Sequence, residues 1–189
     1  MLLEALRAAG IEAIRTREPG GSPGAEEIRR LLVEGPPGRW DPETEALLMV
    51  AARRSHLVET VWPALKAGRW VISDRFADST IAYQGYGRGV ARDSLKKLHK
   101  LIAGDFKPNL SLVLDLPVNK GILRAVTRSS KETRFERMDN AFHERLRRGF
   151  LAIAKAEPKR CVVIDATQDP AAVHAAIKAA IRSRLGVKI

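Results

Sequence analysis

The sequence predicts an α/β protein in which a parallel β-sheet has helices on both faces. Two observations predict this class: short apolar runs typical of buried strands recur along the chain, and amphipathic helical segments separate them. Some of these runs also end abruptly in polar residues, as parallel strands do where they open into a ligand site. The 189 residues are predicted to form a single domain, 1–189.

The order of elements follows from apolar spacing and from the turn residues between segments. Gly10 and Gly68 are expected to end helices, Asp41-Pro42 to begin the longest helix, and Asp93 to cap another. Residues 73–85, directly after the second strand, are expected to form a polar loop that is the floor of a site. The expected strands are 11–16, 71–73, 110–116 and 162–165, and the expected helices are 1–9, 25–33, 42–65, 93–102, 117–127, 137–157 and one from 170 onward.

Composition limits the partners and the compartment. Lys and Arg total 33 against 22 Asp and Glu, a net charge of +11, which suggests an anionic partner; a basic solvated surface explains it equally well. Aromatic residues are only 5% and do not alternate with basic ones, so no specific nucleic-acid partner is predicted. No apolar run is long enough to span a membrane. The lone Cys161 is expected to be a buried apolar side chain in a reducing, cytoplasmic compartment.

The first candidate site residues follow the first predicted strand. Arg17 is suited to bind phosphate, Glu18 to bind a metal or to orient a water, and Gly20-Gly21 to let the backbone approach a ligand closely. Arg29, in the next helix, is expected to point to the same place. An ordinary polar turn is the alternative.

Residues 73–85 supply the second group of candidates. Asp74 is suited to Mg²⁺ or its water shell, and Arg75 to a phosphate. Ser79, Thr80 and Gln84 are suited to hydrogen-bond a base or a sugar. The alternative is that Asp74 and Ser79 only cap the next helix.

Arginines form the remaining candidates. Arg53-Arg54 lies in the long helix, where a charged surface pair is the alternative. The segment 124–137 is a candidate lid over a migrating phosphate, with a solvated basic loop as the alternative; its arginines are Arg124, Arg128, Arg134 and Arg137. The four histidines, His56, His99, His143 and His174, are expected to be surface or packing residues, because no pair has metal-ligand spacing.

Taken together, these motifs resemble bacterial thymidylate (dTMP) kinases, in order and over essentially the whole chain. The resemblance rests on Thr16-Arg17-Glu18-Pro19-Gly20-Gly21, Glu27-Ile28-Arg29, Ala51-Ala52-Arg53-Arg54, Asp74-Arg75-Phe76, Ser79-Thr80, Ala82-Tyr83-Gln84-Gly85, Gly104-Asp105-Phe106-Lys107-Pro108, Leu112-Val113-Leu114-Asp115 and Asp165-Ala166-Thr167-Gln168. It implies a P-loop kinase-like sheet and transfer of the γ-phosphoryl group of Mg·ATP to dTMP, giving dTDP. It also implies a homodimer that packs through long helices such as 43–66.

The resemblance assigns roles residue by residue. Arg29 and Arg75 would hold the dTMP phosphate, and Arg53 would reach the thymine edge, with its neighbour Arg54 as the other choice. The catalytic lid arginine would be Arg128 or Arg134. The remaining substrate residues would be Arg17, Met49, Ser79, Thr80, Tyr83 and Gln84; Glu18 and Asp74 would lie near the metal and phosphates; and Arg124, Ala166, Thr167 and Gln168 would border the adenine of ATP.

Two departures from the family pattern affect these expectations. Leu48-Met49-Val50 stands where many members carry a base-stacking phenylalanine, which keeps a kinase of another nucleoside monophosphate open as an alternative. The sequence also contains no phosphate-cradling Gly-x-x-x-x-Gly-Lys-[Ser/Thr] loop. We therefore expect that roughly 20 residues, a first and central strand with its loop, are missing at the start.

That expectation has consequences for the chain as written. The strands at 71–73 and 110–116 would each lose a hydrogen-bonding neighbour, and the 189-residue chain would be poorly stable and nearly inactive. A non-catalytic nucleotide-binding relative and a basic nucleic-acid-binding module are the other hypotheses.

Overall fold

The computed structural model describes residues 1–126 and 134–189. Its elements in chain order are α1 (Leu2–Ala8), β1 (Ala13–Arg17), α2 (Pro23–Val33), α3 (Pro42–His56), the π-helical η1 (Leu57–Val61), α4 (Trp62–Lys66), β2 (Trp70–Asp74), α5 (Ala77–Thr80), the π-helical η2 (Ile81–Gly87), α6 (Arg92–Ala103), β3 (Ser111–Asp115), α7 (Val118–Val126), α8 (Asn140–Ala156), β4 (Cys161–Asp165) and α9 (Pro170–Leu185). The predicted alternation of strands and helices is confirmed.

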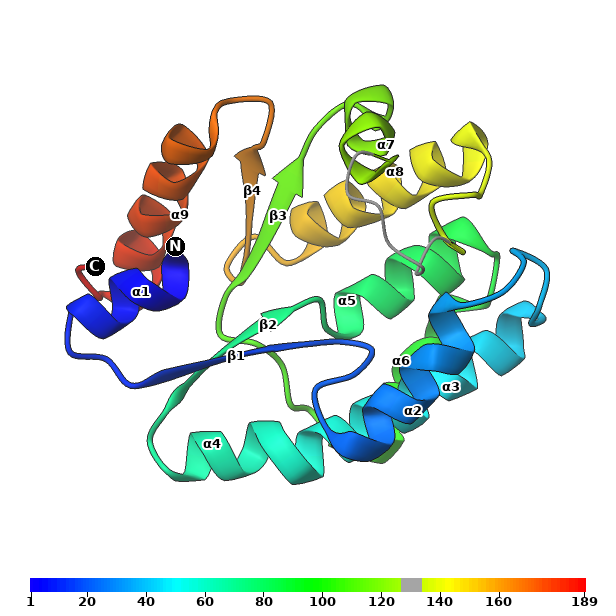
Figure 1. Ribbon diagram of the computed structural model, residues 1–189, viewed down its shortest axis with the longest axis horizontal. Coiled ribbons are helices and arrows are strands. Elements are labelled where there is room, and N and C mark those ends of the chain that lie inside the picture. The colour runs from blue at the N-terminus through cyan, green and yellow to red at the C-terminus, as the bar shows by residue number, and fades with distance from the viewer. Residues whose placement is uncertain (127–133) are drawn as a thin grey trace.

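The strands of the described chain form two parallel pairs (Figure 1). β1 pairs with β2, so that Arg17 lies opposite Asp74, and β3 pairs with β4, so that Asp115 lies opposite Asp165. Within the described residues, β2 and β3 each have one paired neighbour. Each pair therefore brings the polar residues at its two carboxyl ends to one edge.

A cluster of ion pairs links the two strand pairs. Arg160, just before β4, donates from both terminal nitrogens to the carboxylate of Asp78 in α5, at 2.7 and 2.9 Å. The same guanidinium bonds Ser111 Oγ at the start of β3 (2.6 Å) and Glu157 Oε2 (2.9 Å). These contacts hold the segment after β2 against the amino-terminal ends of β3 and β4.

The helix α8 packs against η2 and sets the position of the residues after β2. Phe142 and Leu146 follow one face of α8 and bury themselves against Ala82 and Tyr83. Gly149 allows the close approach, because a Cβ at that position would lie 2.8 Å from the ring of Tyr86. The core under α8 therefore fixes the register of η2.

Three helical features differ from the sequence prediction. The long helix continues through a π-helical turn at Leu57–Val61, because Pro63 has no N–H and its ring cannot fit the regular α-helical ladder. Residues 77–87 are helical rather than a loop, and no side chain caps α5, so neither Asp74 nor Ser79 acts as its cap. Asp93 lies in the first turn of α6, whose N-cap is Ala91.

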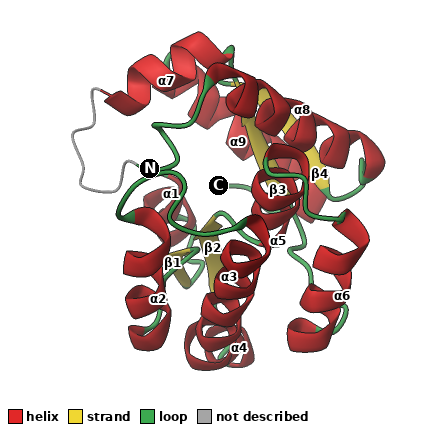
Figure 2. Cartoon of the chain, turned by 90° about the vertical axis from the view of Figure 1, so that its right-hand side faces the viewer, coloured by secondary structure: helices red, strands yellow, loops and turns green. Residues whose placement is uncertain are grey.

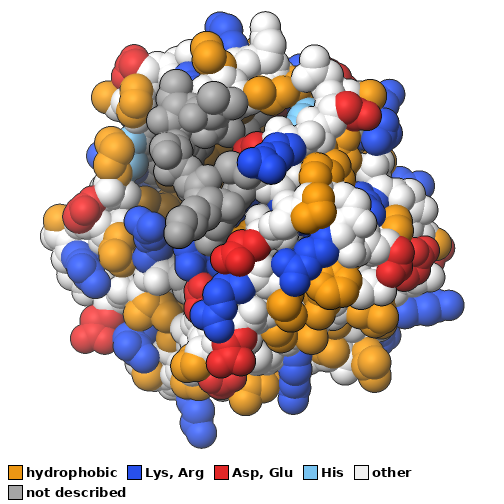
Figure 3. Space-filling model, turned by 45° about the vertical axis from the view of Figure 1, so that its right-hand side comes forward, with side chains coloured by type: hydrophobic (Ala, Val, Ile, Leu, Met, Phe, Trp, Pro, Cys, Tyr) orange, Lys and Arg blue, Asp and Glu red, His pale blue; other side chains and the backbone are white. Residues whose placement is uncertain are grey.

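The helices α2, α3 and α6 lie together below the strands, with α3 between the other two (Figure 2). The Lys and Arg side chains on the face seen in Figure 3 are scattered among acidic and apolar ones and do not form one patch. Among the described residues, no helix is long and apolar enough to cross a membrane.

Candidate active site

A small cavity lies at the carboxyl ends of β1 and β2. Its volume is about 100 Å³. Glu18 and Pro19 reach it directly after β1, and Arg75 and Phe76 directly after β2. The predicted site residues that line it are Glu18, Arg29, Met49, Arg53, Arg75, Ser79, Thr80, Tyr83 and Gln84. Residues from two strand ends and from the helical elements α2, α3, α5 and η2 thus meet in one place.

A buried chain of hydrogen bonds runs behind this cavity. Thr16 Oγ1 bonds His56 Nε2 at 2.7 Å, and His56 Nδ1 bonds Glu18 Oε1 at 3.0 Å. Arg53 Nε donates to the other oxygen of Glu18 at 2.8 Å, and Arg53 Nη2 donates to Thr80 Oγ1 at 2.8 Å. His56, Arg53 and Glu18 are only 0%, 3% and 5% exposed. Arg53 is therefore fixed by partners on two sides.

Gly21 is required by the same network. Its φ is +87°, and a Cβ there would lie 2.4 Å from Thr16 Oγ1 and 2.6 Å from the His56 ring. Thr60 Oγ1 also donates to the carbonyl oxygen of Gly21 at 2.7 Å. The close approach that the sequence predicted for Gly20-Gly21 is thus, at Gly21, an approach to protein side chains.

Two arginines add positive charge to the cavity wall. Arg29 donates from Nη1 to the carbonyl oxygen of Pro19 at 2.6 Å. The Arg75 guanidinium lies over the Tyr83 ring, 4.6 Å from its centroid. Arg75 has a φ of +71°, a left-handed conformation that costs a non-glycine residue about 1–2 kcal/mol. Such local strain is typical of functional sites.

Gln84 lines the cavity, and only one of its two amide atoms has a hydrogen-bond partner within the described part of the chain. Gln84 Nε2 donates to Glu45 Oε1 at 2.8 Å, and both side chains are fully buried. Gln84 Oε1 is buried and has no hydrogen-bond partner among the described residues. A buried acceptor without a partner is costly, so this oxygen is suited to accept from a ligand in the cavity.

Several predicted residues lie elsewhere. Arg17 makes a bidentate ion pair with Glu26 on the exposed surface, at 3.2 and 2.8 Å, and is not part of the cavity wall. This pairing lowers the pKa of Glu26. Arg54 donates to the carbonyl oxygen of Ile102 and stacks over Trp62, so of these two neighbouring arginines it is Arg53 that lines the cavity.

Arg134 contradicts the prediction that it belongs to a mobile lid. It is 1% exposed and pairs with Glu45 Oε2 at 2.6 Å. It also donates to the carbonyl oxygens of Leu32, Pro36 and Pro37. Its side chain is therefore fixed between α2 and α3 and does not reach outward. The other candidate lid arginine, Arg128, lies outside the described residues.

The predicted metal residues Glu18 and Asp74 are not gathered into a cluster. Glu18 lies in the buried network and its two oxygens already bond His56 and Arg53. Asp74 is exposed at the end of β2. In the described ranges no three His, Cys, Asp or Glu residues lie close enough together to hold a metal ion. A direct metal-ligand role for Glu18 does not fit these contacts.

The predicted adenine-binding residues lie near one another at the carboxyl end of β4. Arg124 Nη1 donates to the carbonyl oxygen of Ala166 at 3.0 Å. Thr167 and Gln168 bond the carboxylate of Asp165 instead of projecting freely, and these bonds lower the pKa of Asp165. The loop therefore has a fixed shape with Arg124 beside it.

Sequence reasoning missed four residues of this region. Phe135 and Glu136 line the cavity, and no motif in the sequence pointed to them. The sequence predicts only a surface or packing role for His56, but its ring bonds Glu18. Glu45 was overlooked, although a signal was available: it precedes Met49 and Arg53 by four and eight residues, which places all three on one face of α3.

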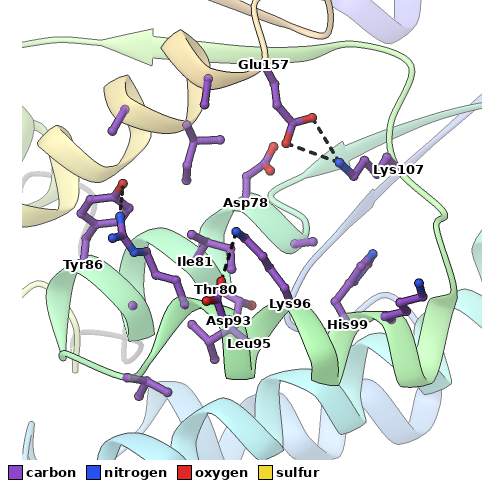
Figure 4. A pocket seen from close by; sticks show the side chains of 18 of the residues that line it. Asp78, Thr80, Ile81, Tyr86, Asp93, Leu95, Lys96, His99, Lys107 and Glu157 are labelled. Atoms are coloured by element: carbon purple, nitrogen blue, oxygen red, sulfur yellow. Dashed lines mark hydrogen bonds and ion pairs between the residues drawn. The ribbon is translucent and has the colours of Figure 1, made fainter.

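A second, larger cavity of about 1030 Å³ lies between α5, η2, α6 and the end of α8 (Figure 4). Most of the charged side chains on its wall pair with one another, as Glu157 does with Lys107 and Asp93 with Lys96. Arg92 donates to the Tyr86 hydroxyl at 2.6 Å. Apart from Arg53 and Thr80, its wall contains none of the predicted site residues.

The parallel strands and the arginine-lined cavity at their carboxyl ends define an α/β protein with a candidate ligand site at the strand ends. The comparisons with known proteins narrow this class. The model of the thymidylate kinase family matches residues 1–177. The thymidylate kinase of Dinoroseobacter shibae is 53% identical over 174 residues, covering 92% of this chain and 84% of the relative. That of Caulobacter vibrioides is 52% identical over 186 residues, covering 98% and 89%.

A solved structure agrees with these relatives. The crystal structure of thymidylate kinase from Ehrlichia chaffeensis matches with a TM-score of 0.73 and 32% sequence identity, covering 96% of this chain and 88% of that one. The chain belongs to the thymidylate kinase family, which has the P-loop kinase fold. It is an enzyme of the nucleoside monophosphate kinase class.

Proposed function

We propose that this chain is a dTMP kinase, which transfers the γ-phosphoryl group of Mg·ATP to dTMP and gives dTDP. The observation that carries the proposal is the composition of the small cavity. Arg29 and Arg75 supply positive charge for a phosphate, and Gln84 Oε1 supplies a buried acceptor for a base. The names of the relatives point to the same acceptor.

The acceptor side of the reaction follows from these residues. Arg29 and Arg75 bind the dTMP phosphate, whose oxygen is the nucleophile, and hold it in one orientation. Arg53 uses two of its five N–H donors on Glu18 and Thr80, and we propose that its remaining donors meet the thymine edge. Met49, Ser79 and Tyr83 enclose the nucleoside.

ATP and Mg²⁺ are proposed for the donor side. ATP supplies the phosphoryl group when it is bound, and Arg124 with residues 166–168 would border its adenine. Mg²⁺ needs only one or two carboxylates beside the phosphates, and Asp74 at the end of β2 suits that role better than the ion-paired Glu18. The catalytic lid arginine remains proposed as Arg128.

The first test is binding of the acceptor. We expect dTMP to raise the melting temperature of the protein more than dAMP, dGMP or dCMP at the same concentration, because only one base satisfies the site. At 100 times the dissociation constant the stabilisation amounts to about 2.7 kcal/mol. Equal shifts with all four monophosphates would contradict the assignment to dTMP. Salt-dependent binding to DNA without any shift would favour a nucleic-acid-binding module.

A separate experiment addresses the phosphate loop that the sequence analysis expects to be missing. The comparisons do not confirm the predicted truncation, because the matches to the two relatives above span 92% and 98% of this chain. The 189 residues contain no such loop motif, and the strands of the described residues form two separate pairs. We expect a chain extended upstream to phosphorylate dTMP faster and to melt higher than the 189-residue chain. Equal rates and equal melting temperatures would reject the truncation.

We also propose a homodimer and a cytoplasmic location. Apolar side chains are exposed along the long helix at Leu47 (54%), Val58 (46%) and Leu65 (41%), and nearby in α6 at Leu101 (81%). Exposed apolar side chains along one long helix suit an interface between copies of one chain. We expect sedimentation at the mass of a dimer, and Leu47→Glu should shift it toward the monomer. Sedimentation of the unchanged protein as a monomer would contradict the dimer.

A further inference from the structure

The structure assigns a positioning role to Glu45. We infer that this residue holds the Gln84 amide in the one orientation that makes the cavity accept a base with a ring N–H. The inference rests on the proposed function, because it deals with how the same cavity chooses its base. It adds a residue that does not itself line the cavity.

The contact between Glu45 and Gln84 has a fixed donor and a fixed acceptor. A carboxylate can only accept hydrogen bonds, so the Gln84 group that faces Glu45 Oε1 at 2.8 Å must be the NH₂. The Gln84 oxygen is then left on the other side, buried and without a partner in the part of the chain that the structure describes. Both side chains are 0% exposed, so water does not compete for either group.

Two arginines hold the Glu45 side chain in place. Its other oxygen, Oε2, pairs with Arg134 at 2.6 Å and with Arg88 at 3.2 Å. Arg134 is itself anchored by carbonyl oxygens of the segment 32–37. Two guanidinium groups thus fix one oxygen of the carboxylate, and the other is directed at Gln84. The amide cannot flip without breaking a buried bond to a charged group.

With the Gln84 amide held in this orientation, the cavity requires a base that donates a hydrogen bond to the Gln84 oxygen. Thymine and uracil carry an N–H at ring position 3, which satisfies the Gln84 oxygen. Cytosine carries a bare nitrogen there, which would place two acceptors opposite each other in a buried site. Leaving a buried polar group unpaired is a strong source of discrimination between otherwise similar substrates. Glu45 does not line the cavity, but by orienting Gln84 it determines the discrimination against cytosine.

The decisive variant is Glu45→Gln, whose amide can either accept or donate. The Gln84 amide is then free to flip and present its NH₂ to the cavity. We expect calorimetric titration of the unchanged protein to give dTMP an affinity about 100-fold or more above that of dCMP and of N3-methyl-dTMP. In Glu45→Gln the ratio of dTMP to dCMP affinity should fall about tenfold or more. A merely structural loss would weaken both ligands alike and leave the ratio unchanged.

The matched control is Arg88→Gln. It removes a partner of Glu45 Oε2 but leaves the bond from Gln84 to Oε1, so the affinity ratio should stay within about twofold of the unchanged protein. An unchanged ratio in Glu45→Gln, beside clear preference for dTMP in the unchanged protein, would overturn the role of Glu45 and leave the proposed function intact. Absence of saturable dTMP binding in the unchanged protein would overturn both.

A second measurement covers the case in which Glu45→Gln does not fold. In the unchanged protein, NMR should find the side-chain NH₂ protons of Gln84 protected from exchange with solvent, both without ligand and with dTMP bound. Exchange as fast as that of an exposed glutamine, in either state, would overturn the inference.

Discussion

Arg53→Ala is expected to lower the free energy of unfolding by about 3–5 kcal/mol and to abolish measurable dTMP binding. Arg53 is the ion-pair partner of Glu18, whose carboxylate is 5% exposed. Removing the guanidinium leaves that carboxylate buried with only His56 beside it, and leaves Thr80 without its donor. Urea unfolding and calorimetric titration with dTMP measure the two effects.

The neighbouring arginine provides the control for this prediction. Arg54→Ala removes the same chemical group one residue further along α3, where it contacts Ile102 and Trp62 at the surface. Its effect on stability should stay within about 1 kcal/mol, and dTMP affinity should not change. Arg53→Lys should bind dTMP weakly, because an ammonium cannot reproduce the two directed bonds of the guanidinium. Retention of full affinity by Arg53→Ala would refute the proposed contact with the base.

Arg134→Ala is expected to destabilise the protein by about 3 kcal/mol or more. The substitution leaves Glu45 buried and removes the bonds that tie residue 134 to three backbone carbonyls of the segment 32–37. A mobile catalytic arginine would behave differently, because its removal would slow phosphoryl transfer and leave the unfolding free energy unchanged. Chemical unfolding of the purified variant therefore separates the two roles.

Arg137→Ala is the matched control, since Arg137 lies three residues away on the exposed surface. It should change the unfolding free energy by less than about 0.5 kcal/mol. If Arg134→Ala and Arg137→Ala have the same free energy of unfolding, then the buried ion pair with Glu45 does not stabilise the protein. That result would favour the prediction that Arg134 is a catalytic lid residue.

The sequence carried much of the site because of how parallel strands are arranged. Glu18 and Arg75 each follow a strand, and the carboxyl ends of paired parallel strands share one edge. Their meeting in one cavity therefore followed from the order of strands alone. Gln84 and Thr80 were predicted because they carry polar side chains in the loop expected after the second strand. The helical form of residues 77–87 was not found, because its packing on α8 decides it.

The sequence did not determine which carboxylate each candidate arginine pairs with. Arg17, Arg53 and Arg134 are all candidate ligand-binding arginines in the sequence, yet one pairs with Glu26 at the surface, one with Glu18 in the interior and one with Glu45. Which carboxylate an arginine meets depends on burial and on contacts between residues far apart in the chain, neither of which leaves a local pattern.

By itself, the sequence determined the α/β class, the family and the residues at the strand ends, because periodicity and short motifs are local properties. The tertiary structure alone decided that His56 supports Glu18, that Glu45 orients Gln84 and that Arg134 faces inward. The physical reason is that a buried polar group must find its partner within the packed interior, and only the complete packing defines which groups share that interior.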